Sequence, residues 1–177
     1  MLELTDEKLM QNVIAGKQAS MNQLIIRYQN DLLRFFTRMS GNKHTAEDMV
    51  QMTFERVYRY RNGYKDDQSF KTWIWQIARN VWNSSFRKHE KLTSLTVNTD
   101  QKVRDASKTF ELQQLIQTAL MTLSEREREL VVFYHLKGFG YKELSQIFET
   151  SEGNLRVIQC RALKKLGQVL KQLGYEH

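Results

Sequence analysis

The sequence contains no proline, a single cysteine and no long hydrophobic run. Because proline is the residue that most strongly interrupts helices, nothing in the chain opposes long helical segments. The one cysteine, Cys160, cannot form an internal disulfide, which agrees with a reducing compartment. The chain also lacks the stretch of about eighteen apolar residues that a membrane span needs, and its N-terminus lacks a signal-peptide pattern. We therefore expect a cytoplasmic protein with no membrane insertion.

The residue groupings on which enzymes depend are also missing. The patterns HExxH, CxxC and GxxxxGKS/T do not occur, and the histidines are scattered, at His44, His89, His135 and His177. The pair Asp66-Asp67 has the composition of a loop turn, in which acidic residues are more often structural than metal-binding. The sequence therefore predicts neither catalysis nor a metal or cofactor.

Helical periodicity dominates what is present. The 177 residues, 41 % of them hydrophobic, are enough for one ordinary domain or two small helical ones. Apolar residues recur at the helical period with little alternation, so we expect an all-α fold of two small helical domains. In the N-terminal half we expect breaks at residues 40–42 and 62–68, and helices that begin after caps at Thr5, Ser20, Thr45 and Ser69.

Positive charge is concentrated in one part of the chain. The formal net charge is +7 at pH 7. Residues 56–91 hold nine Lys or Arg and three Asp or Glu, and so contribute +6 of it. A concentrated patch favours a polyanionic partner, because charges that serve only solubility can be scattered.

The segment Phe70–Lys91 lies inside this basic region and predicts an amphipathic helix. It begins FKTWIWQIARNVWNSSFRK. We expect its apolar stripe to be core, namely Phe70, Trp73, Ile74, Ile77, Ala78 and Val81. Outside the stripe, cations and amides can meet phosphates and base edges, and aromatic rings can stack on unpaired bases. The segment therefore points to nucleic acid.

A polar stretch from His89 to about Lys108 separates two helical regions. It lacks aromatic residues and a sustained apolar stripe, which makes it the best candidate for a linker. We predict a first domain over residues 1–90, a flexible linker over 91–109 and a second domain over 110–177.

The second domain carries the pattern of a helix-turn-helix. Ser124 and Glu127 form a capping-box pattern at the start of one helix, and Gly138-Phe139-Gly140 ends it. Next come a short helix YKELSQIF, a tight turn Glu149-Thr150-Ser151 and a second, cation-rich helix. In such a pair the second helix enters the DNA major groove through its N-terminal half.

Three segments of the chain stand in an order and spacing known from one family. They are AEDMVQMTFERVY, then FKTWIWQIARN followed by Arg87, and finally LSEREREL through YKELSQIFETSEGNLRVIQCRALKKL. Together they resemble the extracytoplasmic-function group of sigma-70 RNA polymerase sigma factors, over about residues 5–170. The resemblance implies a first domain that docks on bacterial core RNA polymerase and opens the promoter. It implies a second domain that reads the upstream promoter element.

The resemblance also implies which residues of the first domain meet each partner. The polymerase-docking surface would hold Asp48, Gln51, Glu55 and Arg56, where mixed charges suit partner specificity. The single-stranded -10 element would meet Tyr64, Lys71, Trp75, Arg79, Asn80, Asn83 and Arg87. The residues themselves leave two alternatives open. Tyr64 and Trp75 can instead be packing residues, and Glu55 with Arg56 can be a solvated helix face.

In the second domain the duplex -35 element would meet residues at and near the second helix. They are Lys142, Glu152, Gly153, Asn154, Arg156, Val157, Cys160, Arg161 and Lys164. Arg156 and Arg161 can reach guanine edges or phosphates, and Gly153 would permit a close backbone approach. Many relatives have a polar or basic residue in place of Ile158 and an aliphatic one in place of Gln159, so the inward face stays open there. Cys160 can be a redox sensor or inert.

The partners that the resemblance implies are core RNA polymerase, promoter DNA and an anti-sigma factor. The chain itself would then carry no catalytic step. The alternative is a free-standing helix-turn-helix regulator, whose N-terminal domain serves dimerisation or sensing. The segment FKTWIWQIARN favours the sigma factor, because a repressor needs no strand-capture surface beside the highest positive charge.

Overall fold

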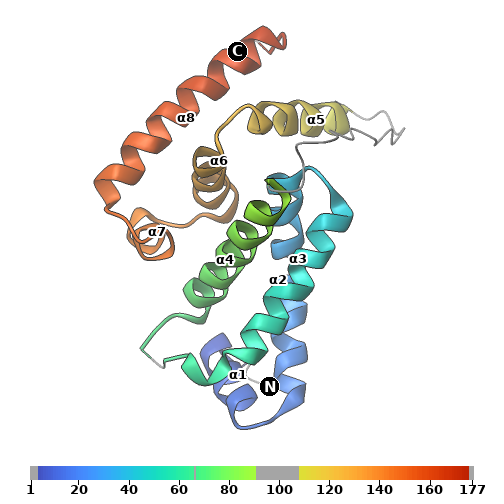
Figure 1. Ribbon diagram of the computed structural model, residues 1–177, viewed down its shortest axis with the longest axis vertical. Helices are drawn as coiled ribbons and strands as arrows, with labels where there is room; N and C mark the ends of the chain where they lie inside the picture. Colours follow the sequence, from blue (N-terminus) through green and yellow to red (C-terminus); the bar gives the residue numbers. More distant parts are fainter. Residues whose placement is uncertain (1–3, 66, 91–107, 176–177) are drawn as a thin grey trace. The chain divides into compact units, whose positions relative to one another are not determined.

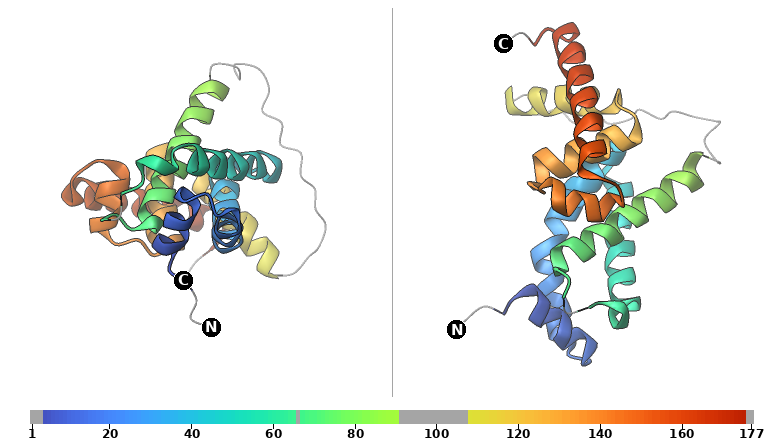
Figure 2. Two further views of the ribbon diagram at one scale, coloured as in Figure 1. Left: turned by 90° about the horizontal axis from the view of Figure 1, so that it is seen from below. Right: turned by 90° about the vertical axis from the view of Figure 1, so that its left-hand side faces the viewer.

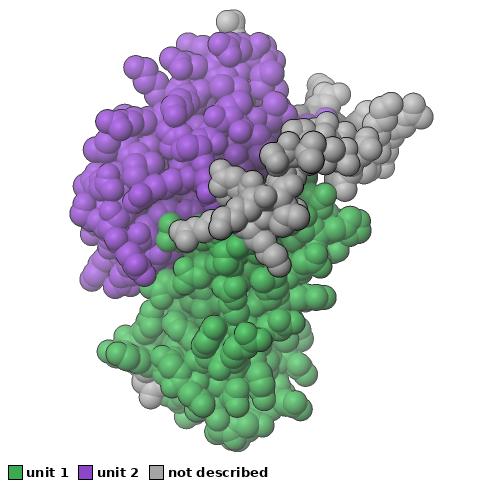
Figure 3. Space-filling view, viewed as in Figure 1, with its two compact units in different colours: residues 1–88 green, residues 89–177 purple. Residues whose placement is uncertain are grey.

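The computed structural model of the protein describes residues 4–65, 67–90 and 108–175. Throughout these residues the regular secondary structure is helical, without a strand, as the sequence predicted (Figure 1). The chain divides into two compact units, unit 1 (Met1–Lys88) and unit 2 (His89–His177), which Figure 3 colours separately. Residues 91–107 of the predicted linker lie outside the described residues, so the linker and the domain bounds stay predictions.

The elements of unit 1 pack around one long helix. They are α1 (Asp6–Ile14), α2 (Gln18–Ser40), α3 (Lys43–Arg59), the short 3-10 turn η1 (Arg61–Gly63) and α4 (Phe70–Glu90). Both α1 and α3 contact α2, and α2 and α3 lie side by side (Figures 1 and 2). The predicted cap at Thr5 and the break at Gly41 are confirmed: Thr5 Oγ1 accepts from the Lys8 N–H, and Gly41 has a φ of 70°.

Two predicted helix caps, Ser20 and Thr45, each lie three residues after the observed caps, Lys17 and Asn42. Helix α2 begins at Gln18, because Ser20 is buried within its first turn rather than placed before it. Helix α3 begins at Lys43, because the Asn42 side chain accepts a hydrogen bond from the Thr45 N–H at 3.0 Å and so caps the helix earlier. Both differences move a helix start toward the preceding turn.

Aromatic side chains of α2 and α4 form the core of unit 1. Every residue of the predicted α4 stripe is buried: Phe70, Trp73, Ile74, Ile77, Ala78 and Val81. Tyr28 of α2 meets Phe70 edge to face, with ring centres 5.4 Å apart, and Phe35 of α2 meets Trp75 in the same way at 5.3 Å. Such pairs add about 0.5–1.5 kcal/mol each beyond area burial, so α4 is fixed to α2 through its rings.

Unit 2 contains the predicted helix-turn-helix. Its described elements are α5 (Lys108–Met121), α6 (Glu125–Val131), the π-helical segment η2 (Val132–Leu136), α7 (Tyr141–Phe148) and α8 (Glu152–Gln172). Helix α8 packs against both α6 and α7 (Figures 1 and 2). The bounds of α7 and the cap at Ser151 are as predicted, whereas periodicity gave no sign of the π-helical continuation of α6.

The turn between η2 and α7 is anchored by an aromatic ring. Gly138 adopts a φ of 66°, and the following Phe139 is buried against Phe133, with ring centres 5.7 Å apart. Phe133 also meets Phe148 of α7 edge to face. The glycine break predicted at 138–140 is thus a packed corner that sets where α7 begins. No helix within the described ranges combines the length and apolar character needed to cross a membrane.

Candidate nucleic-acid interface

The outer face of α3 carries the residues assigned to polymerase docking. Asp48, Gln51 and Glu55 are exposed, and their spacing places them on one side of the helix. Arg56 is half-buried, and its Nη2 donates a hydrogen bond to Ser84 Oγ of α4 at 3.0 Å. The structure therefore separates the set into three accessible side chains and one that ties α3 to α4. Their role toward a partner stays a prediction.

Exposed aromatic residues at the end of α3 were missed by the sequence analysis. Tyr58 is 45 % exposed and Tyr60 is 56 % exposed. The guanidinium of Arg61 lies over the Tyr58 ring, 4.3 Å from its centre, and donates a hydrogen bond to the Tyr58 carbonyl at 2.8 Å. The signal was present as the alternating letters YRYR. It passed unnoticed because a helix end rich in cations is usually only a solvated terminus.

Helix α4 presents the polar residues assigned to the -10 element. Asn80 is exposed, whereas Lys71, Arg79 and Asn83 are half-buried. Arg79 and Asn83 are one turn apart and share a sector of the helix with Asn80. Arg87 lies in α4, but its side chain is outside the described part of the chain.

Tyr64 and Trp75, which the resemblance assigned to the -10 element, are buried. Trp75 is 2 % exposed and Tyr64 is 6 % exposed. The Tyr64 ring lies 5.2 Å from the Trp73 ring, and its hydroxyl donates to the Gln68 carbonyl at 2.6 Å. A base needs an open ring face, which neither residue offers in this fold. The alternative that both are packing residues describes the structure.

Helix α1 supports the start of α4, which the sequence analysis did not foresee. The Asp6 carboxylate accepts hydrogen bonds from Arg27 and from the Tyr28 hydroxyl of α2. Burial, followed by this contact with Asp6, raises the pKa of Tyr28 well above its usual value. The Glu7 carboxylate accepts a hydrogen bond from the Phe70 N–H at 3.2 Å, and so serves an otherwise unpaired donor of the first turn of α4.

All residues assigned to the -35 element are exposed in unit 2. On or beside α8 they are Glu152, Gly153, Asn154, Arg156, Val157, Cys160, Arg161 and Lys164, and on α7 Lys142. A Cβ on Gly153 would meet no atom within 4 Å, so the isolated fold does not require glycine there. The Asn154 amide donates to Thr150 Oγ1 at 3.1 Å, which holds it beside the turn.

The inward face of α8, left open by the sequence, contains Gln159 rather than Ile158. Leu155, Gln159 and Ala162 are buried, and Ile158 is half-buried. The Gln159 side-chain nitrogen lies 2.7 Å from Nε2 of His135 in η2. The polar Gln159 thus lies on the inward face of α8, where the π-helical segment provides it with a polar partner.

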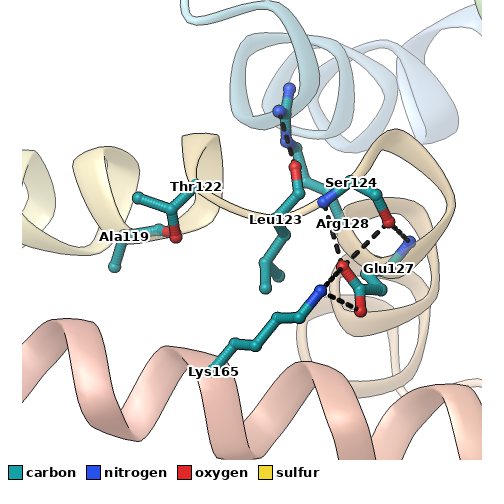
Figure 4. A network of polar contacts seen from close by, with 7 residues as sticks. All are labelled: Ala119, Thr122, Leu123, Ser124, Glu127, Arg128 and Lys165. Carbon is teal, nitrogen blue, oxygen red and sulfur yellow. Dashed lines mark hydrogen bonds and ion pairs between the residues drawn. The ribbon is translucent and has the colours of Figure 1, made fainter.

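A network of polar contacts holds α8 to the rest of unit 2 (Figure 4). Ser124 and Glu127 form the predicted capping box at the start of α6. Lys165 of α8 donates to the two carboxylate oxygens of Glu127 at 2.8 and 3.0 Å. The Arg128 guanidinium donates to the carbonyls of Leu120 and Leu123 at the end of α5. The network orients α8 without using any of the residues assigned to the -35 element.

Hydrogen bonds within this network stabilise the ionised form of the Glu127 carboxylate. Its side chain is only 11 % exposed. Burial would raise the pKa of Glu127, but the hydrogen bonds from Lys165 and Ser124 outweigh it and hold the pKa below the ordinary 4.5. The carboxylate is therefore ionised at neutral pH and the contact with Lys165 is a charge-assisted pair.

Neither unit offers a grouping of side chains suited to metal-dependent chemistry in its described part. Within residues 4–65, 67–90 and 108–175, no three His, Cys, Asp or Glu residues gather as metal ligands. Cys160 is exposed on α8. The polar residues instead lie along helix faces, an arrangement that suits contact with an extended partner.

Comparison with known proteins places both units in one family. Residues 24–92 match the Sigma-70 region 2 family, and residues 113–166 match the Sigma-70 region 4 family. The ECF RNA polymerase sigma factor SigM of Bacillus subtilis (strain 168) is 32 % identical over 154 residues, which cover 83 % of this chain and 93 % of SigM. SigW of the same organism is 25 % identical over 187 residues, covering 97 % of this chain and all of SigW.

Two solved structures share the fold. CnrH, solved with the cytosolic domain of CnrY, has a TM-score of 0.75 at 22 % identity, covering 94 % of this chain and 97 % of CnrH. RpoE of Bartonella quintana, solved with the anti-sigma factor NepR, has a TM-score of 0.73 at 23 % identity, covering 85 % of this chain and 96 % of RpoE. From its identity to SigM over most of both chains, together with the matches of both units, the chain belongs to the extracytoplasmic-function group of sigma-70 RNA polymerase sigma factors.

Proposed function

We propose that this chain is an alternative sigma factor that binds core RNA polymerase and directs it to promoters with particular -10 and -35 elements. The observation that carries the proposal is the presence, in one chain, of the region 2 and region 4 matches in that order. The basic segment 56–91 lies entirely within the region 2 match, where a strand would be held. Catalysis belongs to the polymerase, and this chain supplies the address and helps to separate the strands.

Unit 2 reads the duplex -35 element through α8. Exposed arginines can form paired hydrogen bonds with guanine in the major groove, and Lys142 and Lys164 can neutralise phosphates. The buried side of α8 and its link to Glu127 fix the helix so that these side chains project together. A rigid helix loses little freedom on binding, which favours selectivity between sequences.

Unit 1 holds the displaced strand of the -10 element. Opening a duplex costs about 1.4 kcal/mol per base-pair step in lost stacking, which contacts to the free strand must offset. The half-buried cations and amides of α4 serve this purpose, and the exposed Tyr58 and Tyr60 add ring faces. We assign the two tyrosines to strand contact in place of Tyr64 and Trp75.

Two protein partners follow from the family. The exposed face of α3 with Asp48, Gln51 and Glu55 docks on core polymerase, and the factor works in the cytoplasm, where that enzyme acts. RpoE of Bartonella quintana was solved with an anti-sigma factor. We propose an anti-sigma partner for this chain as well, one that covers the docking face and keeps the factor inactive.

Run-off transcription with core polymerase stripped of its own sigma factor tests the proposal. Fragmented genomic DNA from the source bacterium is the template, with and without the chain, and RNA start sites are mapped. Defined starts that need the chain would support the proposal and give both promoter elements. Stable binding of the chain to duplex DNA without any starts would instead favour the free-standing regulator.

A docking-face variant separates polymerase binding from DNA binding. Gln51→Arg places a cation on the exposed face of α3 while leaving α4 and α8 unchanged. We expect fewer starts and weaker retention on core polymerase, with unchanged binding of -35 duplex by the free chain. Loss of duplex binding in this variant would contradict the division between the two units.

A further inference from the structure

Arg156, the α8 arginine that we assign to the -35 element, lies over an aromatic ring. Its Cζ is 4.3 Å from the centre of the Tyr141 ring. Its Nη2 lies 3.5 Å from a carboxylate oxygen of Glu152, one helical turn earlier, and the Arg156 side chain is 61 % exposed. One flat face of the guanidinium is therefore covered, while N–H groups at its edge stay accessible to an outside acceptor.

Tyr141 is itself held in place by the fold. It is the first residue of α7 and is half-buried. Its ring centre lies 4.8 Å from that of Tyr134 in η2. Burial and the neighbouring Tyr134 raise the pKa of Tyr141, although Arg156 acts in the opposite direction, so its hydroxyl is neutral at pH 7. The ring is a fixed, uncharged platform beneath Arg156.

We propose that Tyr141 is a positioning residue for promoter specificity, whose ring holds the Arg156 guanidinium flat so that its edge meets one base pair of the -35 element. The inference rests on the proposed function and concerns a residue outside the predicted DNA-binding set. A stacked guanidinium loses less freedom than a mobile one when it forms two parallel hydrogen bonds with guanine.

This role differs from that of a general phosphate contact. Attraction to a phosphate depends weakly on direction, so a mobile cation serves it well. Paired hydrogen bonds to a base require the guanidinium plane to be set in advance. The effect of the Tyr141 ring therefore falls on the one base pair that Arg156 reads, and it changes discrimination between sequences more than overall affinity.

The test uses the full chain bound to core RNA polymerase and promoter fragments that each carry one changed base pair in the -35 element. The measured quantity is the ratio of affinities for the unchanged fragment and each changed one. The variants are Arg156→Ala, Tyr141→Phe, Tyr141→Leu and the double variant Tyr141→Leu with Arg156→Ala. Lys142→Ala, next to Tyr141 and exposed on α7, is the matched control. A phosphate contact lowers binding to every fragment by one factor and leaves the ratios unchanged.

We expect Arg156→Ala to reduce discrimination at one or two adjacent base pairs, by on the order of tenfold. Tyr141→Leu should reduce it at the same positions by about threefold or more, because the guanidinium becomes mobile. Tyr141→Phe keeps the ring and should keep the ratios. The double variant should be no worse than Arg156→Ala, since the ring acts only through the arginine.

Several outcomes would overturn the inference. One is that Tyr141→Leu lowers the affinity for every fragment by the same factor. Another is that the double variant discriminates less well than Arg156→Ala alone. If far-UV circular dichroism shows that Tyr141→Leu is unfolded, Tyr141→Met takes its place under the same criterion. If Arg156→Ala removes the discrimination and Tyr141→Leu keeps it, the inference about Tyr141 is overturned but the proposed function is not. A wild-type holoenzyme that shows no preference among the fragments would overturn the proposed function together with it.

Discussion

The two units present their candidate DNA-binding residues in opposite ways. In unit 1, α4 forms the core together with α2, and among the described side chains of the predicted -10 set only Asn80 is exposed. In unit 2, every residue predicted to meet the -35 element is exposed. Helix α4 is thus mainly a buried support for its surface, whereas α8 itself forms most of the exposed surface.

The difference follows from how broadly each helix is packed. Helix α4 buries rings on more than one side, including Trp75 and Trp82, so that few positions remain for contact. Helix α8 is buried through a narrow stripe of Leu155, Gln159 and Ala162, so its other positions are open. A helix that enters a groove must be free on most sides, whereas a helix that holds a single strand can be partly buried.

Trp75→Ala should have the largest effect, and it should be confined to unit 1. Removal of a fully buried tryptophan that packs on Phe35 is expected to cost about 3–5 kcal/mol of unfolding free energy. All three tryptophans, Trp73, Trp75 and Trp82, lie in unit 1, so urea unfolding followed by tryptophan fluorescence reports that unit. Ile26→Ala, in α2 of the same unit, is the control, because Ile26 is 67 % exposed and its loss should change stability little. A Trp75→Ala variant as stable as wild type would show that the ring is not core.

Lys165→Ala should weaken unit 2 while leaving unit 1 unchanged. It removes the donor that neutralises the buried Glu127 carboxylate, and we expect a loss of about 1–2 kcal/mol, limited because Lys165 is half-exposed. The measurement is the unfolding phase seen by far-UV circular dichroism and absent from tryptophan fluorescence. Lys164→Ala, the exposed neighbour, is the control. Equal effects of the two variants would show that the contact between Lys165 and Glu127 does not stabilise α8.

The ionised Glu127 carboxylate should also make the stability of unit 2 depend on pH in the acid range. Because the pKa of Glu127 is lower in the folded state than the ordinary 4.5, its contribution is complete above pH 4.5 and is lost as the pH falls through the folded value. The stability of unit 2 should therefore decline below pH 4.5, and Glu127→Gln should decline less steeply. The comparison is made by urea unfolding at a series of pH values. Equal slopes for the two proteins would contradict the lowered pKa.

Salt dependence should distinguish contacts on single strands from contacts on duplex. Lys71→Ala in unit 1 should reduce promoter opening on all templates and lower the slope of log affinity against log salt by about 0.7, as for one phosphate of a single strand. Lys142→Ala in unit 2 should lower the duplex slope by about 0.9. Filter binding of a -10 single strand and a -35 duplex supplies both numbers. An unchanged slope for either variant would exclude its lysine from phosphate contact.

Gly153→Ala should have the smallest effect on the stability of the free protein. It should stabilise the free protein slightly but weaken its binding to the -35 element. Since no atom lies near its missing Cβ, alanine should stabilise α8 by up to about 1 kcal/mol. If the backbone of α8 approaches DNA at this point, the same change should weaken -35 binding. Unchanged affinity in a stabilised variant would show that Gly153 serves no close approach.

Sequence reasoning predicted the outer face of α8 better than that of α4. A narrow stripe with tight caps leaves little ambiguity, and the cap at Ser151 and the bounds of α7 were read correctly. In α4, Trp75 lies beside the predicted stripe, and whether such a ring is buried depends on Phe35, which is far away in the sequence. The tyrosines Tyr58 and Tyr60 were overlooked for the converse reason, because their exposure depends on where α3 ends.

By itself the sequence determined the helical class, the helix-turn-helix and the basic character of residues 56–91. These features depend on periodicity, capping residues and charge, which are properties of neighbours in the chain. Only the tertiary structure decided that Tyr64 is buried, that Glu7 supports the start of α4 and that Tyr141 lies beneath Arg156. Each of these contacts joins residues of different helices or turns, whose approach is set by packing and not by local preference.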